Sequence, residues 1–317
     1  MSVSVFAPIS IGNVSVGFDI LGLAVLPIDG SLVGDIVHVQ LAKDQLSENE
    51  LSISGTHADR LPSKKTDNIV WQCLLVFNQE LIKAGRTVVT VEMMLEKNIP
   101  TSSGLGSSAC SVVAAIAALN FFYDKPFDEL KLLKLMVQLE AEISGSKHYD
   151  NVAPCYLGGL QLILDNAEKI TQKLPVFDDC YWVMAYPDVL VSTKAARDIL
   201  PKKYDRQTCI KFGQNLAGFI DASYRQDKSQ AFAFLKDELA EPYRKHLLPN
   251  FELAKLSLES FGCLAVGISG SGPTLFAVTD DLSIAEKTRD WLMGNYLQTE
   301  QGFVHICKVD HLGTRKI

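Results

Sequence analysis

The segment from residue 99 to residue 120, "IPTSSGLGSSACSVVAAIAALN", is the feature that most constrains how this chain can fold. It joins a stretch rich in glycine and serine to an apolar run of helical character. Gly104 and Gly106 leave the backbone amides uncovered at the turn, and Ser107 and Ser108 are typical of the first turn of a helix. Free N–H groups and the positive end of the helix dipole then face one point, which favours an anion such as phosphate.

Three other interpretations of this segment have to be weighed. "GLGSSA" also fits the dinucleotide fingerprint G-x-G-x-x-A, but a Rossmann unit returns to a parallel strand after its helix. Here "FDELKLLKLMVQLEAEIS" (127–144) predicts a second helix instead. A Walker A loop needs a lysine after its last glycine, and no suitable glycine has one. A tight turn capped by serine, with no ligand, stays open on this motif alone.

A carboxylate lies on the apolar side of the helix predicted for residues 128–144. Residues such as Leu132, Met136 and Leu139 form one broad apolar arc, and Glu140 falls inside it. A buried carboxylate is costly without a cation, whereas a residue at the edge of the arc could reach water. If Ser108 lies beside phosphates, its hydroxyl and Glu140 together suit Mg²⁺.

Composition excludes several classes of function. With 317 residues, 47% of them hydrophobic, the chain is long enough for two globular domains. The net charge of -7 argues against a nucleic-acid binder. The apolar part of the uncharged run 98–123 is only about 15 residues, too short for a membrane span. Seven scattered cysteines without a C-x-x-C pair favour the reducing cytoplasm.

Hydrophobic periodicity predicts an α+β fold. Strands are expected at residues 2–6, 35–42, 87–95, 158–164, 180–187, 263–269, 274–279 and near 302–309. Helices are expected at 68–84, after the glycine segment, and at 128–144, 193–199, 206–225, 228–238, 250–260 and 283–293. The second half resembles a ferredoxin-like unit more than a doubly wound sheet. The polar stretch 164–179 suggests a boundary between domains at 1–165 and 166–317.

Three segments together resemble the GHMP family of small-molecule kinases: "APISIGNVSVGFD" (7–19), "PTSSGLGSSAC" (100–110) and "GISGSGPTLF" (267–276). The stretches "HYDNVAP" (148–154), "STKAAR" (192–197) and "EPYR" (241–244) are similar to the members that phosphorylate homoserine. The resemblance covers essentially the whole chain. Two positions depart from the usual pattern of those members, Gly12 in "SIGN" and Ser102, and they could alter loop flexibility and nucleotide affinity.

The resemblance implies an architecture and a reaction. The fold would be the GHMP kinase fold, with an N-terminal domain like domain 2 of ribosomal protein S5 (1–165) and a ferredoxin-like C-terminal domain (166–317). ATP and the amino acid would meet in the cleft between them. The side-chain hydroxyl of L-homoserine would be phosphorylated to O-phospho-L-homoserine, for threonine biosynthesis. The family often forms homodimers, and neither nucleic acid nor a membrane is an expected partner.

The resemblance also implies site residues. The ATP phosphates would be held by Pro100, Thr101, Ser102, Ser103, Gly104, Leu105, Gly106, Ser107, Ser108, Ala109 and Cys110, with Asn68 and Val70 beside the base. Mg²⁺ would be bound by Ser108 and Glu140. The amino acid would meet Asp19 at its ammonium, Arg197 and Arg244 at its carboxylate, and Asn13 and Asn151 near its hydroxyl, with Thr193 in the same pocket.

The chemistry of these side chains agrees with such a substrate. A guanidinium can hold a carboxylate in two places, and a carboxylate suits an ammonium. Taken singly, Arg197 and Arg244 could be surface charges and Asp19 a turn residue. Asn151 has no useful basicity, so we predict direct in-line transfer in which Asn13, Asn151, Ser108 and Glu140 position and stabilise, without a strong general base.

Several alternatives are weaker. His148 as a base and Cys155 as a nucleophile have no partner spacing to support them. Another GHMP alcohol kinase is the nearest rival, and the two arginines favour an amino acid over mevalonate or a sugar. A ligand-binding regulator of the same fold, without catalysis, would not need residues arranged for a metal. A dehydrogenase is the most distant alternative.

Overall fold

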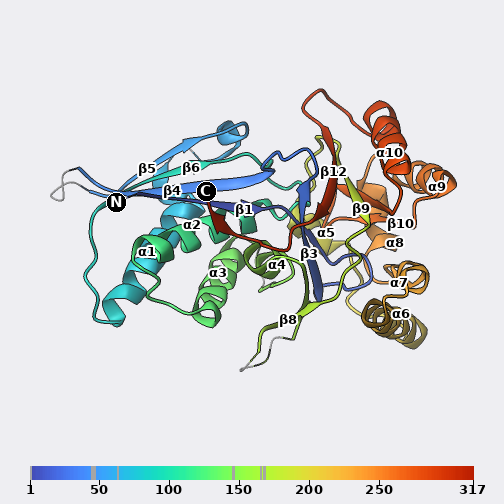
Figure 1. Ribbon diagram of the computed structural model, residues 1–317, viewed down its shortest axis with the longest axis horizontal. Coiled ribbons are helices and arrows are strands. Elements are labelled where there is room, and N and C mark those ends of the chain that lie inside the picture. Colours follow the sequence, from blue (N-terminus) through green and yellow to red (C-terminus); the bar gives the residue numbers. More distant parts are fainter. Residues whose placement is uncertain (1, 44–47, 63, 145–146, 165, 167–168) are drawn as a thin grey trace.

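The computed structural model describes residues 2–43, 48–62, 64–144, 147–164, 166 and 169–317. Its elements form two β-sheets with helices packed against them (Figure 1). The first sheet has five strands, in the order β13 (Arg315–Lys316), β1 (Ser2–Pro8), β4 (Gly34–Leu41), β6 (Val91–Glu96) and β5 (Glu50–Ser54). One face of it is covered by the helices α1 (Ile69–Lys83), α2 (Ser107–Phe122) and α3 (Glu129–Ser144).

The second sheet has eight strands. The main path runs β10 (Ala265–Ile268), β11 (Leu275–Thr279), β9 (Tyr181–Tyr186), β12 (Phe303–Val309), β3 (Leu21–Pro27), β7 (Leu160–Ile163) and β8 (Thr171–Leu174), and β2 (Ser10–Gly12) pairs with β3. The helices of the second half are α5 (Thr193–Asp198), α6 (Arg206–Arg225), α7 (Lys228–Phe234), α8 (Glu241–Arg244), α9 (Phe251–Phe261) and α10 (Leu282–Asn295). The remaining elements are α4 (Val152–Leu157) and the short 3₁₀ turns η1 (Ala58–Arg60), η2 (Lys65–Asp67) and η3 (Lys245–Leu247).

Strands from both halves of the sequence share the second sheet. β3 pairs with β12, with Pro27 opposite Cys307, and β7 pairs with β8 across the predicted domain boundary. In the first sheet β13 returns to β1, so the two ends of the chain lie close together (Figure 1). Residue 165 lies outside the described residues, and the division into 1–165 and 166–317 stays a prediction.

The prediction of an α+β fold is confirmed. The prediction that a helix, α3, and not a strand follows α2 is also confirmed. The helix predicted at 206–225 has those bounds, whereas the strand predicted from residue 87 begins at Val91. The sequence did not reveal β3, "LGLAVLP". All but one of its residues are buried, so it lacks the alternation that marks a strand with one wet face.

Helix α2 runs through the interior of the first domain-like unit, between the first sheet and the other helices. Of its 16 residues, all but Ser108 and Phe121 are buried, which explains why the segment carries no charge. Among the described residues, no helix, α2 included, combines the length and the apolar character that crossing a membrane requires.

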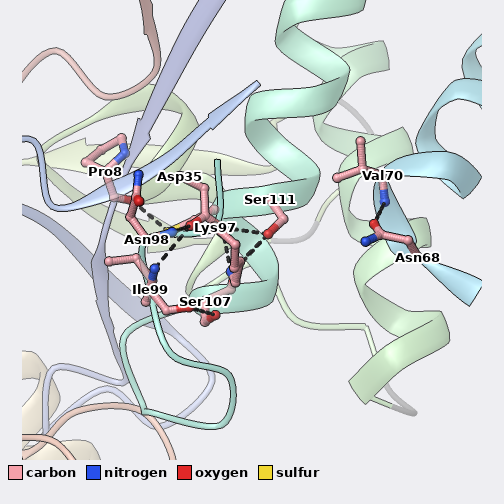
Figure 2. A network of polar contacts seen from close by, with 10 residues as sticks. Pro8, Asp35, Asn68, Val70, Lys97, Asn98, Ile99, Ser107 and Ser111 are labelled. Carbon is pink, nitrogen blue, oxygen red and sulfur yellow. Dashed lines mark hydrogen bonds and ion pairs between the residues drawn. The ribbon is translucent and has the colours of Figure 1, made fainter. Parts of the chain in front are cut away.

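A buried ion pair fixes the start of α2 (Figure 2). The Lys97 side chain is 1% exposed, and its ammonium donates to Asp35 Oδ2 at 2.5 Å, to the Ser107 carbonyl oxygen at 2.9 Å and to Ser111 Oγ at 3.0 Å. The other oxygen of Asp35 accepts from the two backbone N–H groups that follow Lys97. All three N–H donors of Lys97 are therefore used, and β4, the end of β6 and α2 are joined at one point.

We expect Lys97→Met to lower the free energy of unfolding by about 3–5 kcal/mol, because Asp35 then keeps a buried charge with no cation beside it. Urea unfolding followed by far-UV circular dichroism measures this. Lys83→Ala, which breaks the surface pair with Glu80, is the matched control and should change it by less than about 0.5 kcal/mol. A loss for Lys97→Met no larger than that of the control would contradict the structural role of the buried pair.

Candidate active site

A cavity of about 680 Å³ lies beside the N-terminus of α2 and is lined by residues from both halves of the chain. Its size suits a small-molecule site. Most sequence-predicted residues line it: Asn13, Asp19, Asn68, Thr101, Ser102, Ser103, Gly104, Gly106, Ser107, Ser108, Glu140, Asn151, Thr193, Arg197 and Arg244. Five others are not among the lining residues: Val70, Pro100, Leu105, Ala109 and Cys110.

Four of the five residues away from the cavity wall belong to the hydrophobic core. The side chains of Val70, Leu105, Ala109 and Cys110 are buried in the hydrophobic core. Cys110 Sγ donates to the Pro8 carbonyl oxygen at 3.2 Å. The Val70 N–H donates to Asn68 Oδ1 at 2.9 Å, so Asn68 caps the start of α1 (Figure 2). A motif read along the chain includes such core positions, since it does not tell which side of the backbone faces the site.

Residues 100–106, here called the glycine loop, connect to α2 with two glycines in left-handed conformations. Gly104 has a φ of +79° and Gly106 one of +67°. A β-carbon at Gly104 would lie 2.6 Å from the Ser269 carbonyl oxygen, and one at Gly106 would lie 2.3 Å from Ser10 Oγ. Both positions therefore require glycine, for conformation and for space.

The carbonyl groups of the glycine loop are held by neighbouring segments. Thr274 donates to the Ser103 carbonyl from its N–H and its hydroxyl, at 3.2 and 2.7 Å. Ser269 Oγ donates to the Gly104 carbonyl at 2.6 Å, and the Ser10 N–H donates to that of Leu105 at 3.2 Å. Among the described residues, the N–H groups of residues 101–106 make no backbone hydrogen bond of good geometry, although Thr101 and Ser102 form a turn. Because the loop lines the cavity, these amides are available to a ligand there.

These donors fit the phosphates of a nucleotide. Amides at a helix N-terminus bind anions well, and the dipole of α2 adds to the attraction. The buried Ser103 hydroxyl and the side-chain nitrogen of Asn68 also have no hydrogen-bond partner among the described residues. A ligand with phosphate and ring acceptors would supply such partners.

Ser108 and Glu140 meet on the cavity wall, one from the first turn of α2 and the other from α3. Glu140 Oε2 is buried, so of the two interpretations of its place on the apolar arc the structure supports the buried one. Burial raises the pKa of Glu140 to about 7, although the nearby Ser108 hydroxyl acts against this rise. A hydroxyl and a carboxylate beside a phosphate site are the oxygen ligands that Mg²⁺ prefers, so these residues fit that ion.

The other end of the cavity holds two guanidinium groups. Arg197 makes a bidentate ion pair with Asp19, at 3.1 and 2.9 Å. Arg244 is only 3% exposed and donates to the carbonyls of Ala196 and Gly270, at 2.9 and 3.0 Å. Both guanidiniums lie over the Phe18 ring. Burial lowers the pKa of Arg244, and its position excludes the interpretation as a surface charge.

Two further residues at this end were not predicted as ligands, His148 and Asp150. His148 Nδ1 lies 3.4 Å from Asp19 Oδ1, and Asp150 is 4% exposed. One ligand atom each of Asp19, His148 and Asp150 lie within 4.8 Å of one another. Burial raises the pKa of Asp150 to about 7, and the charge of Asp19 adds to the rise. The only sequence signal for Asp150 was its place beside Asn151.

The two asparagines brace the junction between the ends of the cavity. Asn13 accepts from the Asp19 N–H at 2.9 Å and donates to the Gly270 carbonyl at 3.0 Å. Asn151 Oδ1 accepts from Ser10 Oγ at 3.0 Å, next to Gly106 of the glycine loop. A β-carbon at Gly12 would lie 2.5 Å from Asn151 Nδ2, so the glycine that departs from the usual pattern allows this approach.

Thr193 is the last of the predicted residues. It begins α5, four residues before Arg197, and its hydroxyl lies 3.5 Å from that of Ser271. The loop of the third motif thus reaches the end of the cavity that holds the two guanidinium groups, as well as the glycine loop.

The comparisons with known proteins agree with this architecture. Residues 68–159 match the family model "GHMP kinases N terminal domain" and residues 220–292 match "GHMP kinases C terminal". The crystal structure of homoserine kinase from Cytophaga hutchinsonii is 33% identical with a TM-score of 0.89, over 100% of this chain and 97% of that one.

More distant structures share the fold alone. The mevalonate kinase of Methanococcus jannaschii is 15% identical with a TM-score of 0.69, over 98% of each chain. The phosphomevalonate kinase of Streptococcus pneumoniae is 12% identical with a TM-score of 0.69, over 100% of this chain and 99% of that one. The chain belongs to the GHMP kinase family, whose members are phosphotransferases that use ATP.

Proposed function

We propose that this protein is an ATP-dependent homoserine kinase, which converts L-homoserine to O-phospho-L-homoserine in threonine biosynthesis, with Mg²⁺ as cofactor. One observation carries the proposal: a single cavity places groups of both charges that complement an amino-acid zwitterion next to a glycine loop with available amides. Similarity to the homoserine kinase of Cytophaga hutchinsonii supports it.

The nucleotide would occupy the end of the cavity formed by the glycine loop and Asn68. Amides of the loop and of the first turn of α2 would hold the phosphates, without the lysine that a Walker A loop uses. Ser108 and Glu140 would bind Mg²⁺, which neutralises charge on the phosphate oxygens. With the cation bound, the ionised form of Glu140 is favoured, despite its burial.

On binding, the amino acid would replace an ion pair that two side chains of the protein make with each other. In the structure Asp19 and Arg197 neutralise each other. An ammonium placed beside Asp19, His148 and Asp150 meets three acceptors for its three N–H groups, and a carboxylate placed at Arg197 and Arg244 meets two guanidiniums. Because the substrate brings one charge of each sign, this exchange leaves no buried charge without a partner.

The reaction would be an in-line displacement. The homoserine hydroxyl oxygen bonds to the γ-phosphorus while the bond to the bridging oxygen breaks, and ADP leaves. The hydroxyl proton passes late to an oxygen of the transferred group, since a loose transition state chiefly needs positioning and charge stabilisation. Asn151, held by Ser10 beside the glycine loop, would orient the hydroxyl, and Asn13 would fix Asp19 through its backbone. We assign Asp150 to the ammonium.

The direct test is ADP release by the purified protein with Mg²⁺-ATP and a panel of homoserine, serine, mevalonate and galactose. We expect kcat/KM for homoserine to exceed that for mevalonate by at least about 100-fold, because mevalonate leaves the ammonium acceptors unpaired. Serine should be poor because its hydroxyl is one methylene closer to the zwitterionic head. Turnover of mevalonate or galactose without turnover of homoserine would refute the substrate while keeping the family.

The pH dependence tests the role of Asp150. At saturating Mg²⁺-ATP, kcat/KM for homoserine should fall below about pH 7, because Asp150 then takes up a proton and loses the charge that holds the ammonium. The kcat should stay level there, because the bound ammonium keeps Asp150 ionised.

Two variants test whether Asp150 causes this fall of kcat/KM below about pH 7, here called the acidic limb. Asp150→Asn should remove the limb and raise KM about tenfold at pH 8, whereas His148→Gln should leave the limb in place. A limb near pH 7 in kcat itself would identify Asp150 as a proton acceptor and overturn the mechanism without a base.

Asn151→Ala should lower kcat by about 100-fold and change KM for homoserine little, because the amide orients the reacting hydroxyl rather than the zwitterionic head. Steady-state kinetics at saturating Mg²⁺-ATP measures both. Ser10→Ala, which removes only the hydroxyl that holds Asn151, should produce a smaller loss of the same kind. An increase in KM with unchanged kcat would instead place Asn151 at the head of the amino acid.

A further inference from the structure

Arg60 lies at the edge of the cavity and connects the first half of the chain to the second. It belongs to η1, and its guanidinium donates to Asp188 Oδ1 at 2.9 Å, to Gln301 Oε1 at 3.0 Å and to the Tyr186 hydroxyl at 3.3 Å. Arg60 lines the cavity, as do Leu61 and Pro62 after it. The predicted motifs included neither Arg60 nor any of its partners.

The segment that carries Arg60 is anchored to the residue that holds the start of α2. The His57 N–H donates to the Lys97 carbonyl at 2.9 Å, and the Lys97 N–H donates to the Ser54 carbonyl at 2.7 Å. Gly55 packs so tightly here that a β-carbon would lie 2.6 Å from the Lys97 backbone nitrogen. A displacement of Arg60 is therefore resisted by the framework behind the glycine loop.

Asp188, the ion-pair partner of Arg60, is also held in place by other contacts. Asp188 adopts a φ of +58°, uncommon for a residue with a side chain, and its other oxygen accepts from Thr299 Oγ1 at 2.6 Å. The carbonyl of Pro187, the residue before Asp188, accepts from the Gln298 N–H at 3.0 Å. Asp188 is thus a fixed point on the segment that leads into α5, whose side chains Thr193 and Arg197 line the cavity.

The ion pair of Arg60 and Asp188 is partly shielded from solvent. The side chains of Arg60 and Asp188 are 22% and 12% exposed, so solvent screens the pair less than a surface pair. The hydrogen bonds to Asp188 and Tyr186 raise the pKa of Arg60. A charge-assisted bond of this kind restrains the distance between the segments it joins.

We propose that Arg60 is a positioning residue for both substrates: through Asp188 it holds the part of the cavity wall formed by Arg60, Leu61 and Pro62 at a fixed distance from α5 and its Arg197. This rests on the proposed function for the identity of the substrates. The contact adds no ligand for ATP or for homoserine. It sets the separation of the two walls that bind them.

The test is a double-mutant cycle of Arg60→Ala, Asp188→Asn and the double variant. Each single change should raise KM for ATP and for homoserine about fivefold, a factor set by a modest loss of binding free energy, with kcat within about twofold. The double variant should be no worse than the poorer single variant, because both remove one contact. Arg60→Lys, which keeps the charge but not the planar fork, should recover part of the loss.

Hydrogen–deuterium exchange supplies a readout that does not depend on turnover. Exchange of residues 55–62 and of 187–199 should become faster in either single variant, because each segment loses its partner across the cavity. The matched control is Arg225→Ala, which breaks an exposed pair with Asp221 on α6 and should change neither exchange nor kinetics.

The outcomes separate this proposal from the proposed function. If the wild-type protein turns over no homoserine but both segments exchange faster in Arg60→Ala, the substrate assignment falls and the contact across the cavity stands. Additive effects of the single variants, a change confined to kcat, or unchanged exchange in 187–199 would each overturn the role of Arg60.

Discussion

The buried pair of Lys97 and Asp35 is the interaction on which the rest of the structure depends. Two charges in a dry interior are costly unless every donor and acceptor is used, and here they are. Lys97 stands before the glycine loop and Ser107 after it, and the Lys97 ammonium donates to the Ser107 carbonyl. Ser107 Oγ in turn donates a hydrogen bond to the Ile99 carbonyl at 3.1 Å. The loop is therefore closed at its base, and its shape is set before any ligand binds.

The cavity is prepared for charge in a similar way. The glycine loop lines the cavity, and Thr274, Ser269 and Ser10 hold its carbonyls in place. At the other end Asp19 and Arg197 keep each other neutral, and the Phe18 ring lies beneath both guanidiniums. Groups that are already oriented lose little conformational freedom on binding, so more of the interaction energy is available for recognition.

Periodicity and local chemistry predicted the parts of the molecule that depend on neighbours in sequence. Helix α6 is an example, and the place of Glu140 on the apolar arc of α3 indicated that its carboxyl could be buried. Strand β3 was missed because burial on both faces removes alternation. Asp150 lies in a short polar segment with no period, and Arg60 and Asp188 are brought together only by the fold. Val70 and Leu105 belong to the predicted motifs yet pack in the core.

The pairing of β3 with β12 has a consequence for biosynthesis. Phe303–Val309 is synthesised long after its neighbour Leu21–Pro27, because most of the sequence lies between them. At about 5–20 residues per second, the edge of β3 that pairs with β12 waits tens of seconds for its partner. The nascent chain cannot mature one half at a time. A chain that ends before Phe303–Val309 would leave this edge of β3 unpaired. Such an edge is a substrate for chaperones or for aggregation.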